Sequence, residues 1–407
     1  MENQNKARAD LRQLMPFFIV AFVGIIYHLR IRPMAGDDVF FSQATSELGL
    51  WDYLIQRYEA WTSRFVIEFL LVWIIKYPIL WRLIDLTLFI SFPVLISKIF
   101  DGGKLMDWCA AAAVLLYPFH DMGTAGWITT TVNYFWPVWG MFFVGFLLKK
   151  MLVHKKINIV EGIAGVLVCV IASSHEQVAV ILFEVFILYG IYLICGKSKK
   201  MPLVQDSAGS TLTDKKVIHS NNLYLAGMVL VNIITLISIL FCPGNAGRNA
   251  VSIADLPIFE TYGFGDKLYL GLLSIERVFI ANCDAVFLTV ALVLAMLVYV
   301  KTDDYKKTII SALPVLILFG QTAMRTAYPG LSGLFVMPQE ITEWSWGTLS
   351  TWLPMVYLAV TVAAMLYALW IILGEQPIEY IYALLMLGCG FGAGMILGFM
   401  ATIYAFR

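Results

Sequence analysis

The sequence predicts an all-α, polytopic integral membrane protein with about eleven transmembrane helices, and three observations lead to this fold class. The 407 residues are 60% hydrophobic and 14% charged, whereas a soluble domain is about 25% charged. The apolar residues form continuous runs, many of them close to the roughly 20 residues that cross a bilayer. These runs do not alternate with polar residues as in a membrane β-barrel, so the spanning backbone must be helical.

The charge balance excludes several functional classes. Lys and Arg total 28, and Asp and Glu also total 28. A chain without a basic excess is not expected to bind nucleic acid, and one so apolar is not expected to be disordered. The sequence has no Walker A motif, no H-E-x-x-H motif and no Cys/His cluster with metal-ligand spacing, which leaves ATP-driven transport and zinc proteolysis unsupported.

The candidate spans follow the chain in order. The apolar runs are residues 14–31, 65–79, 82–97, 105–119, 134–149, 157–173, 177–195, 222–242, 279–300, 308–324, 352–373 and 378–404. A loop predicted on the non-cytoplasmic face and a turn predicted on the cytoplasmic face enclose two apolar runs, 65–79 and 82–97. That arrangement requires an odd number of crossings, so one of the two is expected not to cross.

Lysine-rich loops orient the chain in the cell membrane, because short cytoplasmic loops carry an excess of Lys and Arg. Such loops lie at 149–156, 197–216 and 301–307, which puts the N-terminus in the cytoplasm. The polar stretch 196–221 is predicted to be a cytoplasmic linker between an N-terminal membrane module (1–195) and a C-terminal one (222–407).

The first non-cytoplasmic loop, 33–63, carries an acidic pair, Asp37 and Asp38, directly after Gly36. Two carboxylates at such a position can cap a helix start. They can also act as a general base or a metal ligand, because a carboxylate near an apolar boundary gains basicity by desolvation. An amphipathic stretch at 50–61 follows, with aromatic residues at helical spacing, and it is predicted to lie along the membrane interface.

Other polar motifs fall on the same predicted face, in segments 120–133, 174–176, 243–268 and 325–351. Each alone is compatible with a solvated turn or an interhelical hydrogen bond, but together they predict a wet, aromatic cavity. The four-residue spacing of Arg64 and Glu68 predicts an ion pair on one helix face. The candidate binding residues are Arg64, Glu68, His120, Asn133, Tyr134, His175, Glu176, Asn245, Arg248 and Arg325.

Two cysteines allow one disulfide. Cys242 and Cys283 lie near predicted span ends on the same side, so a bond between them is compatible with the topology.

The acidic pair and these motifs resemble the GT-C glycosyltransferases, and more closely the bacterial membrane proteins related to GtrII-type glucosyltransferases. The resemblance implies an inverting transfer of a sugar from a polyprenyl-phosphate carrier to a cell-surface glycan or lipid acceptor on the non-cytoplasmic face. It implies Asp37 as the base, and Asp38 as its partner or as a ligand of a divalent cation such as Mg²⁺ or Mn²⁺. Arg248 or Arg325 would hold the donor phosphate, and the lipid tail would lie between helices.

Two other functions remain open. A transporter or flippase of a lipid-linked sugar would place its ionisable residues near the bilayer midplane, whereas here they gather in loops on one face. A polymerase, ligase or acyltransferase would use His120 or His175 as the base instead of the aspartates.

Overall fold

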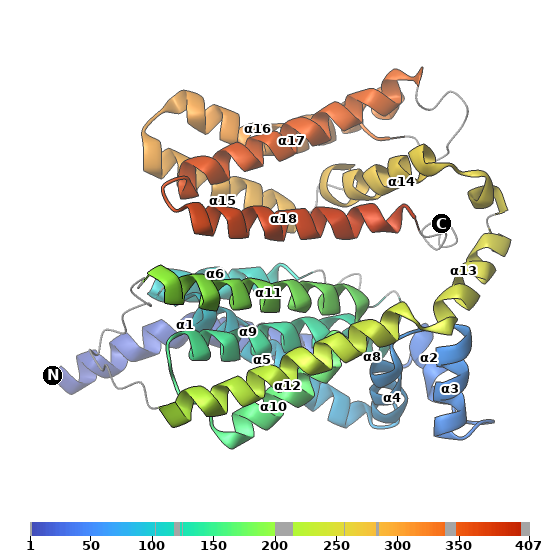
Figure 1. Cartoon of the computed structure of the whole chain (residues 1–407). Helices are drawn as coiled ribbons and strands as arrows, with labels where there is room; N and C mark the ends of the chain where they lie inside the picture. The colour runs from blue at the N-terminus through green and yellow to red at the C-terminus, as the bar shows by residue number, and fades with distance from the viewer. Residues whose placement is uncertain are drawn as a thin grey trace. The chain divides into compact units, whose positions relative to one another are not determined.

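The computed structural model describes residues 2–101, 103–117, 123, 125–199, 215–255, 257–281, 285–337 and 347–399. Within these ranges every regular element is a helix (Figure 1), which confirms the all-α prediction for this part of the chain. In the described part of the chain, eight helices are long and apolar enough to cross a membrane. The chain is therefore a multi-pass membrane protein, while the predicted total of about eleven crossings and the orientation stay predictions.

The chain forms two compact units, Met1–Arg248 and Asn249–Arg407. The helices of the first unit are α1 (Glu2–Arg30), α2 (Asp37–Gln43), α3 (Leu50–Ala60), α4 (Phe65–Ile74), α5 (Pro78–Phe100), α6 (Gly103–Leu115), α8 (Trp127–Thr130), the π-helix η1 (Thr131–Phe135), α9 (Trp136–Leu152), α10 (Ile159–Ser173), α11 (Glu176–Lys199) and α12 (Lys215–Leu240). Helix α13 (Pro243–Asp255) runs across the boundary.

The boundary between the units falls after Arg248 and not in the polar stretch 196–221, because α12 packs against α10 and α11. Part of that stretch, residues 200–214, lies outside the described residues. The two helices that flank it, α11 and α12, both belong to the first unit.

The helix lengths show that run 65–79, which contains α4, is too short to cross, whereas run 82–97, which lies in α5, is not. Helix α4 has 10 residues, about 15 Å at 1.5 Å per residue, which is half of a hydrocarbon core of about 30 Å. Helix α5 has 23 residues. Proline at its first position suits a helix start, and Asp101 at its end has the left-handed conformation that commonly terminates a helix.

Buried side chains tie α1, α5 and α9 together in the first unit. The Asp85 carboxylate lies 3.0 Å from Nε2 of His28 on α1 and accepts a hydrogen bond of 2.7 Å from Nε1 of Trp136 on α9. Trp81 of α5 is fully buried and donates to the Thr131 hydroxyl at 2.8 Å. Because polar groups in an apolar interior need partners, these bonds fix the rotation of α5 and α9 about their axes.

The second unit is built around a smaller set of helices. They are the 3₁₀ helix η2 (Pro257–Thr261), α14 (Phe264–Glu276), the π-helix η3 (Arg277–Ala281), α15 (Ala285–Thr302), α16 (Tyr305–Ala327), the 3₁₀ helix η4 (Pro329–Leu334), α17 (Leu349–Leu373) and α18 (Pro377–Leu397). Helices α15, α16 and α17 pack on one another, and α18 packs against α14.

The cysteine prediction falls partly outside the described residues, because Cys283 is not among them. Cys242 has a free thiol, which donates to the Tyr58 carbonyl at 3.2 Å. In the structure this thiol therefore joins α3 to the end of α12.

Candidate functional site

The two aspartates of the first loop occupy opposite environments. Gly36 has φ of 56°, a conformation that glycine adopts without steric cost, and it turns the chain into α2. Asp37 is exposed at the first position of α2, whereas Asp38 has 0% exposure. The adjacent carboxylates therefore do not form one two-carboxylate site.

The Asp38 carboxylate lies at the start of the α8–η1–α9 helix and accepts hydrogen bonds on both oxygens. Oδ1 accepts from the backbone N and the hydroxyl of Thr129, each at 2.8 Å. Oδ2 accepts from the backbone N of Met34 at 3.1 Å and of Ile128 at 3.4 Å. A carboxylate at a helix N-terminus satisfies N–H groups that the helix leaves unpaired.

Gly126 allows this close approach. It has φ of 104°, and a Cβ atom there would lie 2.6 Å from the Ala35 carbonyl oxygen and 2.7 Å from Oδ1 of Asp38. Any side chain at this position would separate the first loop from the helix start, so the loop and α8 are fitted to each other.

The predicted metal-ligand role does not fit Asp38, because N–H and O–H donors surround both of its oxygens. Divalent cations such as Mg²⁺ need several oxygen ligands pointing inward. No group of three His, Cys, Asp or Glu side chains that could hold a metal ion occurs among the described residues. Asp38 is therefore a hydrogen-bond acceptor for the helix start and not a metal ligand in this arrangement.

A second group of predicted residues does come together, around Arg64. We call Ser63, Arg64, Asn133, Tyr134, His175 and Glu176 the polar cluster. The Arg64 guanidinium binds Glu176 through Nε at 2.9 Å and Nη2 at 2.8 Å, and its Nη1 donates to Oδ1 of Asn133 at 3.4 Å. The Ser63 hydroxyl donates to the same Glu176 carboxylate at 3.0 Å.

Local backbone structure brings these side chains to one place. Asn133 and Tyr134 lie in η1, a π-helix of the kind often found at functional sites. The Arg64 guanidinium lies 5.5 Å from the Tyr134 ring centre, within range of a cation–π contact. Glu176 is the first residue of α11, where the helix dipole favours a negative charge.

His175 is a buried neutral imidazole within the polar cluster. Its ring meets the Tyr134 ring edge to face at 5.4 Å, and neither of its nitrogens has a hydrogen-bond partner among the described residues. Burial and the positive charge of Arg64 together lower the His175 pKa from 6.5 to about 4, against the opposing effect of Glu176. Both ring nitrogens of His175 are buried, so an acceptor hydroxyl does not reach them in this arrangement, which argues against the predicted histidine mechanism at this position.

The predicted pair between Arg64 and Glu68 is wrong. Arg64 precedes α4 with ψ of 44° and is not helical, so four-residue spacing does not put the two side chains on one face. Glu68 instead binds Arg57 of α3, with Nη2 donating to Oε1 at 2.8 Å, and accepts from the Tyr53 hydroxyl at 2.8 Å. The burial of Tyr53 and the nearby Glu68 charge raise the Tyr53 pKa.

One chain of hydrogen bonds joins Asp38 to the polar cluster. Thr129 donates to Asp38 and its carbonyl accepts from the Asn133 amide at 2.9 Å, while the Asn133 oxygen accepts from Arg64. Arg64 in turn binds Glu176. The first loop, the α8–η1 segment, the start of α4 and the start of α11 are therefore held in one arrangement, with Asp37 exposed at its edge.

Asn245 and Arg248 lie at a tight junction between α13 and α3. The Asn245 amide donates to the Ile239 carbonyl at 2.8 Å and so caps the end of α12. A Cβ atom at Gly244 would lie 2.6 Å from the backbone N of Trp61, and one at Gly247 would lie 2.4 Å from the Ala60 carbonyl oxygen. The glycines therefore allow the backbones to touch, and Arg248 is half-buried beside this junction.

The second unit contains the predicted residue Arg325 and an unpredicted carboxylate, Glu276. Arg325 donates from Nη1 to the Ala281 carbonyl at 2.6 Å, at the end of the π-helix η3. Glu276 has 0% exposure and no hydrogen-bond partner within the described ranges. Burial raises its pKa from 4.5 to about 7, against the opposing effects of the Met337 backbone, Arg325 and Arg277.

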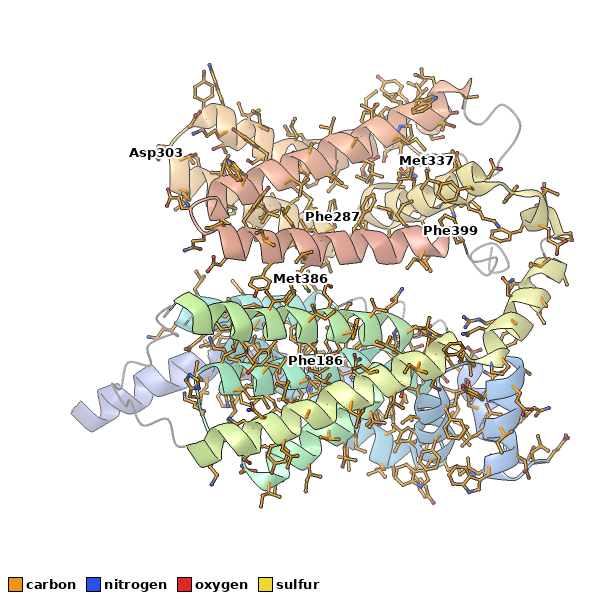
Figure 2. The ribbon with its side chains drawn as sticks, viewed as in Figure 1. Phe186, Phe287, Asp303, Met337, Met386 and Phe399 are labelled. Carbon is orange, nitrogen blue, oxygen red and sulfur yellow. The ribbon has the colours of Figure 1, made fainter. Side chains whose placement is uncertain are left out.

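An apolar cavity of about 590 Å³, partly open at the surface of the second unit, is lined by residues of α14, α15, α17 and α18. Phe287 on α15 and Met386 on α18, both labelled in Figure 2, contribute to its lining. The rest of the lining is largely aliphatic and aromatic, and the cavity is of the size that usually takes a small ligand.

Sequence reasoning missed Arg57 and Glu276. Arg57 lies in the amphipathic stretch 50–61, and its position between Tyr53 and Trp61 is the signal that indicates aromatic surroundings. Glu276 and Arg277 are adjacent charged residues in an otherwise apolar segment. That interruption of the apolar segment is the sequence feature that indicates a buried charge. His120, another predicted site residue, lies outside the described residues.

Comparison of the chain with protein-family models, curated proteins and solved structures gives no match.

Proposed function

We propose that the protein is a membrane glycosyltransferase that transfers a sugar from a polyprenyl-phosphate carrier to a glycan or lipid acceptor on the non-cytoplasmic face. The observation that carries the proposal is the contrast within the acidic pair. Asp37 is exposed, whereas its neighbour Asp38 is buried and bound to the start of α8. An exposed carboxylate on a rigidly held loop can be reached by an acceptor hydroxyl, which is the geometric condition for a general base.

In the proposed reaction the acceptor hydroxyl oxygen attacks the anomeric carbon of the donor sugar from the face opposite the phosphate. The bond between that carbon and the phosphate oxygen breaks, and its electron pair leaves with the polyprenyl phosphate. The hydroxyl proton moves to the Asp37 carboxylate. A phosphate leaving group needs no strong acid, so positioning and charge stabilisation supply most of the rate.

Asp38 and the polar cluster act as positioning residues in this proposal. Asp38 holds the turn that presents Asp37, and its partner Thr129 connects it through Asn133 to the Arg64–Glu176 ion pair. Arg64 is not assigned to the donor phosphate, because Glu176 already neutralises its charge.

Arg248 is the preferred candidate for the donor phosphate because it lies in the same compact unit as Asp37, whereas Arg325 lies in the other unit. A guanidinium matches phosphate oxygens with two parallel hydrogen bonds.

Glu276 supports a second candidate, a transporter of a lipid-linked sugar. A buried carboxylate with a raised pKa is typical of proton-linked membrane transport, and it lies in the same unit as the apolar cavity.

Sugar transfer in proteoliposomes distinguishes these candidates. The wild type is supplied with a series of labelled polyprenyl-phosphate hexoses and with cell-envelope glycan, and is compared with Asp37→Asn. The matched control is Asp52→Asn, which changes an exposed aspartate near the start of α3. Transfer that is lost in Asp37→Asn and kept in the control supports the proposal. Equal transfer in all three overturns the base role, and movement of label between leaflets without transfer favours the transporter.

A further inference from the structure

A groove of about 500 Å³ lies between α2 and α3, apart from the polar cluster. Its lining includes the aromatic rings of Phe40 and Trp61, the side-chain amides of Gln43 and Gln56, and the Arg57 guanidinium. Phe40 is 53% exposed, so one face of its ring is available to a ligand. Pockets of this size bind small ligands through apolar walls with a few fixed polar groups.

Arg57 is held rigidly at the base of this groove. Its Nε and Nη2 both donate to the buried Glu68 carboxylate, at 3.1 Å and 2.8 Å. The rings of Phe40, Phe41 and Trp61 surround the guanidinium, with centres 5.7 to 5.9 Å away. Its Nη1 has no protein partner among the described residues, so its hydrogens can bind a ligand oxygen.

The charge of the groove disfavours an anion. Glu68 cancels the Arg57 charge, and the other charged side chain in the lining is Glu47, an exposed carboxylate. A phosphate would therefore meet no net positive charge, although a single neutral oxygen could still accept from Arg57. The groove is suited to a ligand that is uncharged and rich in hydroxyl groups.

The remaining side chains fit a sugar ring. A pyranose has an apolar C–H face that stacks on an aromatic ring, and its edge carries hydroxyls that both donate and accept. Phe40 and Trp61 supply rings, while Gln43 and Gln56 each supply an amide with two donors and an acceptor. Neither amide has a protein partner within the described residues, so both are open to ligand hydroxyls.

The groove also shares an element with the proposed base. Asp37 begins α2 and Phe40 follows three residues later, one helical turn along the same face. We propose that the groove between α2 and α3 is the subsite for a neutral sugar of the acceptor, placed so that one of its hydroxyls reaches Asp37. The identification of this sugar as the acceptor rests on the proposed function. The binding of a neutral sugar to the groove can be tested without any transfer.

The first experiment measures binding of methyl glycosides of glucose, galactose, mannose and N-acetylglucosamine to the purified full chain by saturation-transfer difference NMR. The expected result is a saturable signal for at least one of them. It should weaken in Phe40→Ala by about five- to tenfold in Kd, which is the contribution of one aromatic face. Phe22→Ala is the matched control, since Phe22 is a similarly exposed phenylalanine of α1 (65%) outside the groove.

Glucose 1-phosphate is the charged probe in the same experiment. If it binds and the neutral glycosides do not, the groove holds a donor phosphate and the proposal is overturned. If no glycoside binds, or if Phe40→Ala binds as the wild type does, the assignment is also overturned.

Kinetics separate this inference from the proposed reaction. Where transfer occurs, Phe40→Ala should raise KM for the acceptor about five- to tenfold and change KM for the lipid-linked donor little. Transfer that depends on Asp37 with an unchanged acceptor KM in Phe40→Ala would contradict the subsite alone. Glycoside binding that depends on Phe40, in a protein that transfers no sugar, would retain the subsite and contradict the transferase.

Discussion

Replacing Asp38 by Asn tests how the first loop is attached to the helix start. Asn has one oxygen and one NH₂ group where Asp has two oxygens. With its oxygen toward Thr129 it keeps the two 2.8 Å bonds, but it turns an NH₂ group toward the N–H groups of Met34 and Ile128. The buried N–H of Ile128 and the part-buried N–H of Met34 then lose their acceptor.

Each buried donor left without an acceptor costs about 1–3 kcal/mol, so Asp38→Asn should destabilise the protein by about 3 kcal/mol. At about 2–4 °C per kcal/mol for a unit of this size, the midpoint of thermal unfolding should fall by about 6 to 12 °C. The assay is tryptophan fluorescence during heating in detergent. Asp37→Asn, which changes an exposed neighbour, should shift the midpoint little because surface substitutions usually stay within about 0.5 kcal/mol.

Thr129→Val provides an internal check on the other carboxylate oxygen, because it removes the hydroxyl that donates to Oδ1 of Asp38 and keeps the side-chain shape. Asp38→Asn keeps that bond, so the two substitutions remove different hydrogen bonds and the destabilisation of the double variant should be close to the sum of the two single effects. An unfolding midpoint of Asp38→Asn within about 1 °C of the wild type would refute the reasoning, because shifts that small correspond to less than about 0.5 kcal/mol.

Three further predictions concern buried ionisable groups. Glu176→Gln leaves the Arg64 guanidinium without its counter-ion and should cost about 3 kcal/mol in unfolding free energy; an unchanged denaturant midpoint would contradict this. The folded-state pKa of His175 is lowered from 6.5 to about 4. The wild type therefore loses unfolding free energy as pH falls from about 6.5 to 4, because the unfolded chain binds a proton that the folded protein does not. A protein without this histidine does not lose it, so His175→Phe should be about 2 kcal/mol more stable than the wild type at pH 5. Equal unfolding midpoints of the two proteins at pH 5 would count against the buried neutral imidazole. The folded-state pKa of Glu276 is raised from 4.5 to about 7. The wild type therefore loses unfolding free energy as pH rises from about 4.5 to 7, because the unfolded carboxyl ionises first. Glu276→Gln should be about 3 kcal/mol more stable than the wild type at pH 8 and similar to it at pH 4. Parallel stability–pH curves for the wild type and Glu276→Gln would exclude the raised pKa.

The sequence predicted the membrane class and the all-helical fold because long apolar runs admit few other structures. It also selected residues that prove to be neighbours: Arg64, Asn133, Tyr134, His175 and Glu176 meet in the polar cluster, although they come from three distant segments. Predicted loop topology was sufficient for this, since all three segments were assigned to the same face.

The partners within the site were not predictable from spacing. Arg64 and Glu68 are four residues apart, but the helix begins after Arg64, so Arg64 pairs with Glu176, 112 residues away, and Glu68 pairs with Arg57 of the preceding helix. The two aspartates are adjacent, and only the close approach of Gly126 reveals that one is buried and the other is not. Boundaries and long-range partners depend on tertiary packing, which periodicity does not encode.

The most direct test of the account is a paired measurement of sugar transfer and thermal unfolding in Asp37→Asn and Asp38→Asn. The account predicts that Asp37→Asn loses transfer with an unchanged unfolding midpoint, while Asp38→Asn lowers the midpoint by about 6 to 12 °C. It also predicts that Asp38→Asn retains measurable transfer at temperatures where it is folded. The reverse pattern, with Asp38→Asn stable but inactive and Asp37→Asn fully active, would contradict the assignment of the exposed carboxylate as the base.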